Sequence, residues 1–78
     1  MFLESEQNFV WVKKENHYSI NDFYDLRHKK LVFRVYYNYP DWMIIVFEKN
    51  KNPEPWSVKF DTLEDAQLYI EDYCERCL

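Results

Sequence analysis

Near the end of the chain, apolar residues recur at intervals of three and four, which is the pattern of an amphipathic helix. These positions are Leu63, Ala66, Tyr69, Ile70, Tyr73, Cys74 and Cys77, and Glu64, Gln67, Glu71 and Glu75 fall on the opposite side. Thr62 supplies a hydroxyl N-cap ahead of two acids that suit the positive end of the helix dipole. The pattern predicts a helix over about residues 63–76.

Three segments before this helix have the pattern of β-strands. Residues 56–61 alternate strictly, so Trp56, Val58 and Phe60 share one face and the intervening polar residues share the other. Residues 31–37 and 42–48 are rich in β-branched and aromatic side chains and flank the turn-forming sequence 38–41. These two segments predict a hairpin, and residues 56–61 predict a further strand.

The remaining segments are less regular. Residues 9–13 form another strand candidate. Between it and the hairpin, either Ser19 or Asn21 caps a short helix through Leu26, or residues 18–20 pair as a strand; we favour a strand that ends at Ile20, followed by a turn of helix. Residues 50–55 contain two prolines, so we expect a stiff connection that does not pair as a strand.

This order of elements predicts a single α+β domain over residues 1–78, with a small antiparallel sheet of about four strands and one C-terminal amphipathic helix on one face. The middle strands are apolar on both faces, but one helix covers only one of them. The second face requires cover from residues 1–3, from the segment around Phe23 and Tyr24, or from another chain. A homodimer that buries Val10, Val12, Ile45 and Phe47 is one such arrangement.

Composition narrows the function classes. The chain has no glycine, so it lacks the phosphate-binding loops of nucleotide-dependent enzymes. The longest apolar run, residues 42–47, is too short to cross a membrane, and no signal-peptide pattern opens the chain, so we expect a cytoplasmic protein without membrane contact. Its net charge of −4, with a net −5 over residues 61–78, does not favour general nucleic-acid binding.

Candidate chemistry is sparse. Cys74 and Cys77 have the spacing of a metal or redox pair, but only His17 and His28 remain to complete a zinc site, and thiolates are disfavoured at the end of a helix. We therefore expect Cys74 to pack as a small apolar residue. Neither histidine has a nucleophile beside it in sequence. We predict a protein that is not an enzyme and that has no catalytic residues, no metal site and no cofactor.

Two clusters remain as binding candidates. Arg27, Lys29, Lys30 and Arg34 form a basic cluster near aromatic residues, which is the basis for an alternative function as a nucleic-acid-binding domain. Aromatic residues gather around the predicted hairpin turn, and aromatic side chains contribute strongly to protein interfaces. The predicted partner-binding residues, which also include two acids of the helix, are Tyr37, Tyr39, Trp42, Trp56, Glu64 and Glu71.

No motif assigns the chain to a family. As a very small, acidic, aromatic-rich chain with sixteen Phe, Trp and Tyr residues, it resembles phage-encoded inhibitors of bacterial defence, including anti-CRISPR proteins. The resemblance implies a stoichiometric protein that blocks a host complex by occupying its surface, with the acidic helix imitating nucleic-acid phosphates. We therefore expect a non-enzymatic protein-binding module with a protein partner.

Overall fold

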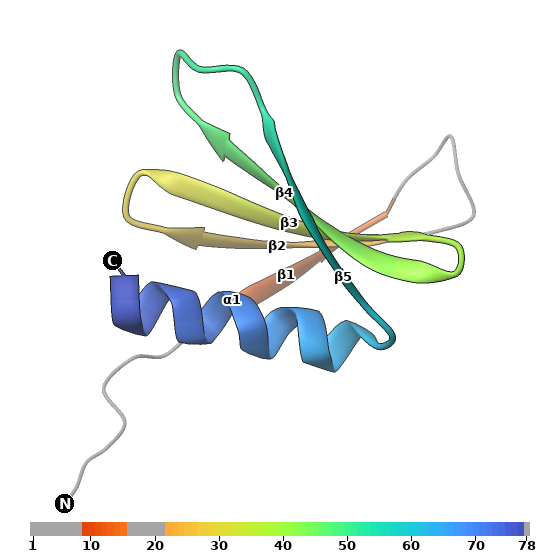
Figure 1. The fold of residues 1–78 in the computed structure, drawn as a ribbon. Coiled ribbons are helices and arrows are strands. Elements are labelled where there is room, and N and C mark those ends of the chain that lie inside the picture. The colour runs from red at the N-terminus through yellow and green to blue at the C-terminus, as the bar shows by residue number, and fades with distance from the viewer. Residues whose placement is uncertain (1–8, 16–21, 78) are drawn as a thin grey trace, which may run out of the picture.

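The computed structural model describes residues 9–15 and 22–77, which form five strands followed by one helix (Figure 1). The elements are β1 (Trp11–Lys14), β2 (Phe23–His28), β3 (Leu31–Asn38), β4 (Asp41–Glu48), β5 (Glu54–Phe60) and α1 (Leu63–Cys77). Every strand pairs antiparallel with its neighbour in sequence, so the sheet order is β1-β2-β3-β4-β5. The predicted α+β class is confirmed, with five strands in the sheet rather than four.

The additional strand is β2, where we expected a turn of helix. Its residues pair with β1 on one side and with β3 on the other. Leu26 turns into the core, and Asp25 lies directly opposite Arg34 of β3. These long-range partners outweigh the local capping signal of Asn21, which lies outside the described residues together with Ile20.

The connection before β5 is also shorter than expected. Pro55 lies inside β5 and pairs in register with Ile45, although the two prolines predicted an unpaired connection. β5 is an edge strand, where a residue without an N–H is tolerated, and the β4–β5 pairing is irregular between Met43 and Ile45. The alternation predicted for residues 56–61 is confirmed over 56–60, where Trp56, Val58 and Phe60 are half-buried and the residues between them are exposed; the strand ends at Phe60, one residue earlier than predicted.

Because the chain has no glycine, other residues must adopt the left-handed backbone conformation in its tight turns. Lys29 in the β2–β3 turn has a φ of 57° and Asn50 in the β4–β5 turn has a φ of 67°, so non-glycine residues take the left-handed conformation. The β3–β4 hairpin is confirmed, with Tyr39 and Pro40 as its turn and a cis peptide bond between them.

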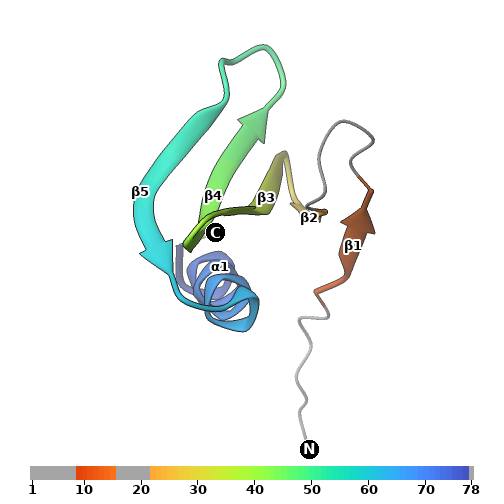
Figure 2. The ribbon, with the colours of Figure 1, turned by 90° about the vertical axis from the view of Figure 1, so that its right-hand side faces the viewer.

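The helix begins and ends close to the predicted bounds. The Asp65 N–H donates to the Thr62 hydroxyl oxygen at 3.1 Å, which confirms the cap. Ala66, Ile70 and Cys74 are buried, and α1 lies across the concave side of the twisted sheet, against β3, β4 and β5 (Figure 2). The core between the two layers consists of Leu26, Phe33, Val35, Ile44, Val46, Ala66, Ile70 and Cys74.

The helix packs on one face of the sheet only, which we call the inner face. The opposite face is called the open face, because the single helix of the described residues lies on the other side. The segment around Phe23 and Tyr24, which was one expected cover, is part of the sheet itself, and residues 1–3 lie outside the described part of the chain. No helix within the described residues has the length and apolar character needed to cross a bilayer.

Candidate protein-binding surface

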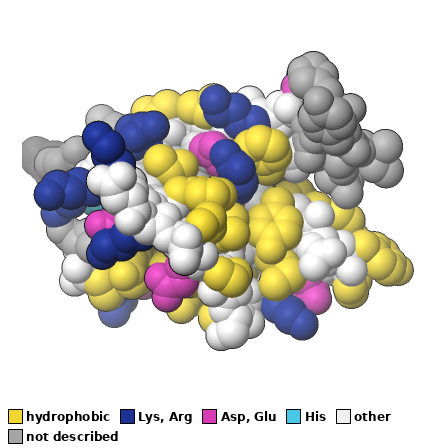
Figure 3. Space-filling view, turned by 90° about the horizontal axis from the view of Figure 1, so that it is seen from above, with side chains coloured by type: hydrophobic (Ala, Val, Ile, Leu, Met, Phe, Trp, Pro, Cys, Tyr) yellow, Lys and Arg dark blue, Asp and Glu magenta, His cyan; other side chains and the backbone are white. Residues whose placement is uncertain are grey.

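The open face carries a continuous group of apolar side chains across all but the last strand. Strand register and alternation place these residues on the same side of the sheet, and all are half-buried or exposed. They are Val12, Phe23, Val32, Tyr36, Met43, Ile45 and Phe47. Because the solvated face of an antiparallel sheet is normally polar, an apolar group of this size is typical of an interaction surface. Figure 3 shows the apolar side chains of this side of the molecule.

An ion pair at the centre of the open face fixes one arginine in place. Arg34 Nε and Nη2 donate to the two carboxylate oxygens of Asp25 at 2.8 and 3.0 Å, so the pair is bidentate. The guanidinium carbon lies 4.1 Å from the centroid of the Phe23 ring and 4.7 Å from that of Phe47. Arg34 is thus held between two aromatic rings, with 32% of its side chain exposed for a partner.

Cations surround this apolar centre. Lys14 on β1, Arg27 on β2 and Lys59 on β5 share the open face and are exposed. Among the described residues of the five strands, the acids on this face are Asp25, which is paired with Arg34, and Asp41 at the start of β4. The open face is therefore net positive, in contrast to the acidic helix on the other side of the sheet.

Three of the predicted partner-binding residues lie together at the β3–β4 hairpin. The ring centroids of Tyr37 and Trp42 are 5.1 Å apart, and those of Tyr37 and Tyr39 are 6.3 Å apart. Tyr39 is 83% exposed at the tip, whereas Tyr37 and Trp42 are half-buried. Register places Tyr37 and Trp42 on the inner face, so this aromatic group is separate from the open face. Its role in partner binding stays a prediction.

The other three predicted residues lie on different parts of the molecule. Trp56 packs on the inner face, with its ring centroid 5.0 Å from that of Tyr73 on α1. Glu64 is exposed near the start of α1 and lines a shallow hollow with Glu71. Glu71 accepts a hydrogen bond from the Trp11 indole at 2.8 Å, so one of its two carboxylate oxygens is already bonded within the fold. The six residues therefore do not form one surface.

The basic cluster divides in the structure. Arg34 is engaged by Asp25, whereas Arg27 and Lys30 line a hollow of about 480 Å³ with Glu48 and Lys49. Lys49 lies in the β4–β5 turn, far in sequence from Arg27 and Lys30, so it was not included in the predicted basic cluster. Lys and Arg side chains gather at the end of the molecule that carries the β2–β3 and β4–β5 turns, at the left of Figure 3. Of the histidines, His28 lies near Phe9 in a tilted arrangement, with ring centroids 5.8 Å apart, and His17 lies outside the described residues.

The two cysteines differ in environment. Cys74 is buried, and burial raises the pKa of its thiol to about 11, with smaller contributions from Glu71 and Glu75. Cys77 is exposed, and both thiols are free. The predicted apolar packing of Cys74 is confirmed. Within residues 9–15 and 22–77, no three His, Cys, Asp or Glu side chains are grouped as metal ligands would be.

Sequence reasoning placed Arg34 in the basic cluster and Ile45 and Phe47 in a possible dimer surface, but it did not predict that Arg34 is held between aromatic rings at the centre of one face. The available signal was a pair of opposite charges, Asp25 and Arg34, each flanked by apolar residues. That signal is useful only once residues 23–28 are known to be a strand. Comparison with family models, curated proteins and solved structures finds no significant match to this chain.

Proposed function

We propose that this protein is a non-enzymatic protein-binding module whose interface is the open face. The single observation that carries the proposal is the apolar group around a clamped arginine, uncovered by the helix of the fold. Aromatic residues, methionine and arginine are the types enriched in the cores of protein interfaces. Ion pairing and ring contacts hold Arg34 before binding, so less conformational entropy is lost when a partner covers it.

The charge of the open face specifies the chemistry of the partner. Lys14, Arg27 and Lys59 surround an apolar centre, so the complementary surface has an apolar centre and an acidic margin. A second copy of the chain is the competing occupant, but two net positive faces repel each other when they meet by a two-fold axis. A foreign acidic protein surface is therefore favoured over a homodimer through this face.

We further propose that the module is a small inhibitor of the phage type, which acts in the cytoplasm by covering a surface of a host defence complex. This part rests on the compositional resemblance to anti-CRISPR proteins and on the size of the domain. A sheet with an apolar face that α1 leaves uncovered suits stoichiometric occlusion, because such binding requires a preformed surface and no conformational change.

Affinity capture with matched variants tests the interface. The tagged protein is incubated with nuclease-treated bacterial lysate beside an Ile45→Glu variant, which alters the open face, and a Leu68→Glu control, which alters an exposed position of α1. Ile45 lies opposite Arg34, so the new carboxylate is accommodated next to a cation and the fold is retained. We expect one defined protein to bind the wild type and the control and to be lost with Ile45→Glu. Loss with the control alone contradicts the proposal.

The alternative function, nucleic-acid binding, is favoured by one specific observation. Arg27 near the end of β2, Lys30 in the β2–β3 turn and Lys49 in the β4–β5 turn line a single hollow together with Glu48, which concentrates positive charge. If this function is the correct one, affinity for a single-stranded oligonucleotide falls steeply with salt and drops when these three residues are changed to Gln. Ile45→Glu then has little effect, which separates the two functions.

A further inference from the structure

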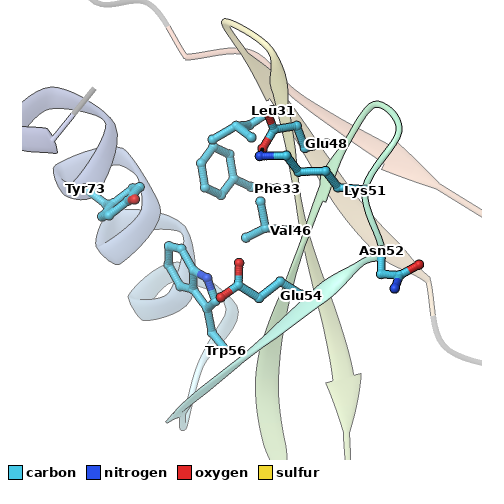
Figure 4. Close-up of a pocket in the computed structure, with 9 residues that line it drawn as sticks. All are labelled: Leu31, Phe33, Val46, Glu48, Lys51, Asn52, Glu54, Trp56 and Tyr73. Atoms are coloured by element: carbon cyan, nitrogen blue, oxygen red, sulfur yellow. Dashed lines mark ion pairs between the residues drawn. The ribbon is translucent and has the colours of Figure 1, made fainter.

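A cavity lies on the inner face, where α1 leaves the end of the β4–β5 hairpin uncovered. The cavity measures about 200 Å³ and lies between the last two strands and the C-terminal half of the helix (Figure 4). Its walls include Leu31, Trp56 and Tyr73, and its rim carries Glu48, Lys51 and Glu54. This site is separated from the open face by the thickness of the sheet.

The aromatic walls are held in fixed orientations. The rings of Trp56 and Tyr73 are 5.0 Å apart and nearly perpendicular, with an interplanar angle of 72°. Phe33 supports both from the core, with its centroid 5.9 Å from that of Trp56 and 6.1 Å from that of Tyr73. Trp56 also meets Tyr69 edge-on at 6.0 Å. The rings that reach the cavity are therefore positioned by the core before any ligand enters.

The charge at the rim is negative. Lys51 Nζ pairs with Glu48 Oε1 at 3.5 Å, so these two charges offset one another. Glu54 pairs with no side chain among the described residues, and Figure 4 shows its carboxylate directed into the cavity beside Trp56. One carboxylate without a cation partner among the described residues therefore lines the same cavity as the Trp56 and Tyr73 rings.

We propose that this cavity binds an arginine side chain of a protein partner. A guanidinium stacks on indole and phenol rings and forms paired hydrogen bonds with a carboxylate, so it uses both the aromatic walls and Glu54. An apolar cavity of roughly 150 Å³ holds a benzene molecule in another protein, so a cavity of 200 Å³ has room for a guanidinium. The inference goes beyond the proposed function, because it concerns the opposite side of the sheet and does not depend on the open face.

Titration with small probes tests the site without a known partner. The full-length protein is titrated with N-acetyl-arginine amide while the indole N–H signal of Trp56 is followed by NMR and assigned with Trp56→Phe. The matched neutral probe is N-acetyl-citrulline amide, which has nearly the same shape but no charge. We expect saturable binding of the arginine probe with a Kd of order 1 mM, as suits one side chain, and at least about tenfold weaker binding of citrulline.

Two variants locate the binding. Glu54 is exposed at the rim, so Glu54→Gln retains the fold, and we expect at least about fivefold weaker binding of the arginine probe. Asp65→Asn removes an equal charge near the start of α1 and leaves the affinity unchanged. Equal binding of citrulline, no effect of Glu54→Gln, or no saturable shift at about 50 mM probe overturns the proposal. The behaviour of Ile45→Glu toward a captured partner is independent of all three results.

Discussion

The Trp11 indole nitrogen donates a hydrogen bond to Glu71 Oε2 at 2.8 Å, across 60 positions of the chain. Trp11 lies on β1 at one edge of the sheet, whereas α1 packs mainly against β3, β4 and β5. This bond therefore connects the first strand directly to the helix. A carboxylate that the sequence pattern placed on the solvent side of the helix has a structural partner instead.

Removal of the indole donor is expected to destabilise the fold. Trp11→Phe retains an aromatic ring but leaves Glu71 without this donor, and a hydrogen bond to a charged group is worth about 1.5 kcal/mol or more. The free energy of unfolding, measured by urea denaturation with far-UV circular dichroism, should fall by about that amount. Glu75→Gln, at an exposed position on the same helix, is the control. Additive effects of Trp11→Phe and Glu71→Ala in a double-mutant cycle would show that the two side chains do not interact.

The Arg34 clamp depends on the shape of the guanidinium as well as on its charge. Arg34→Lys retains the charge but loses the paired hydrogen bonds to Asp25, so we expect a loss of about 1 kcal/mol in the free energy of unfolding. Asp25→Asn should have a similar cost, and the double variant should cost less than the two single changes together. A lysine variant as stable as the wild type would contradict the clamp.

The Thr62 hydroxyl that caps the N-terminus of α1 should stabilise the fold, and a serine at this position should keep that contribution. Thr62→Ala removes the oxygen that accepts the Asp65 N–H and should cost about 1 kcal/mol. Thr62→Ser retains the hydroxyl and should restore most of this loss. Thermal unfolding of the three proteins under one condition provides the measurement, and equal midpoints for Ala and Ser would refute the assignment.

The cysteines should differ in reactivity and in their effect on pH dependence. Cys77 should react rapidly with a thiol reagent in the folded protein, whereas Cys74 should react only when the fold opens. Because burial raises the Cys74 pKa from 9.0 to about 11, its contribution to stability is complete below pH 9 and is lost as the pH rises toward 11. In the Cys74→Ala variant, the free energy of unfolding should decline less between pH 9 and pH 11 than it does in the wild type. Identical pH profiles for wild type and variant would contradict the assignment.

Much of the fold was predictable because several segments have strong local signals. The helix has both periodicity and a cap, and residues 56–60 alternate cleanly between half-buried and exposed. β2 was not predicted, because it contains no β-branched residue and follows a competing capping signal. Its stability as a strand comes from pairing with β1 and β3, which no local pattern encodes.

The candidate site was less predictable than the fold. Two-sided hydrophobicity of β3 and β4 indicated an uncovered face, and this face includes Val12, Ile45 and Phe47 from the predicted dimer surface. The arrangement of Arg34 between Phe23 and Phe47 requires the register of three strands, so it emerges only in three dimensions. The aromatic residues selected from the sequence mostly lie on the inner face because alternation alone does not tell which side the helix covers.

The most direct measurement of the central claim is the Kd of the purified captured partner for three forms of the protein, determined by calorimetry. The wild type and Leu68→Glu should bind with equal affinity, and Ile45→Glu should bind at least tenfold more weakly, which corresponds to about 1.4 kcal/mol. Higher salt should weaken wild-type binding, because Lys14, Arg27 and Lys59 meet an acidic margin. Equal affinity of Ile45→Glu and the wild type would contradict the assignment of the open face as the interface.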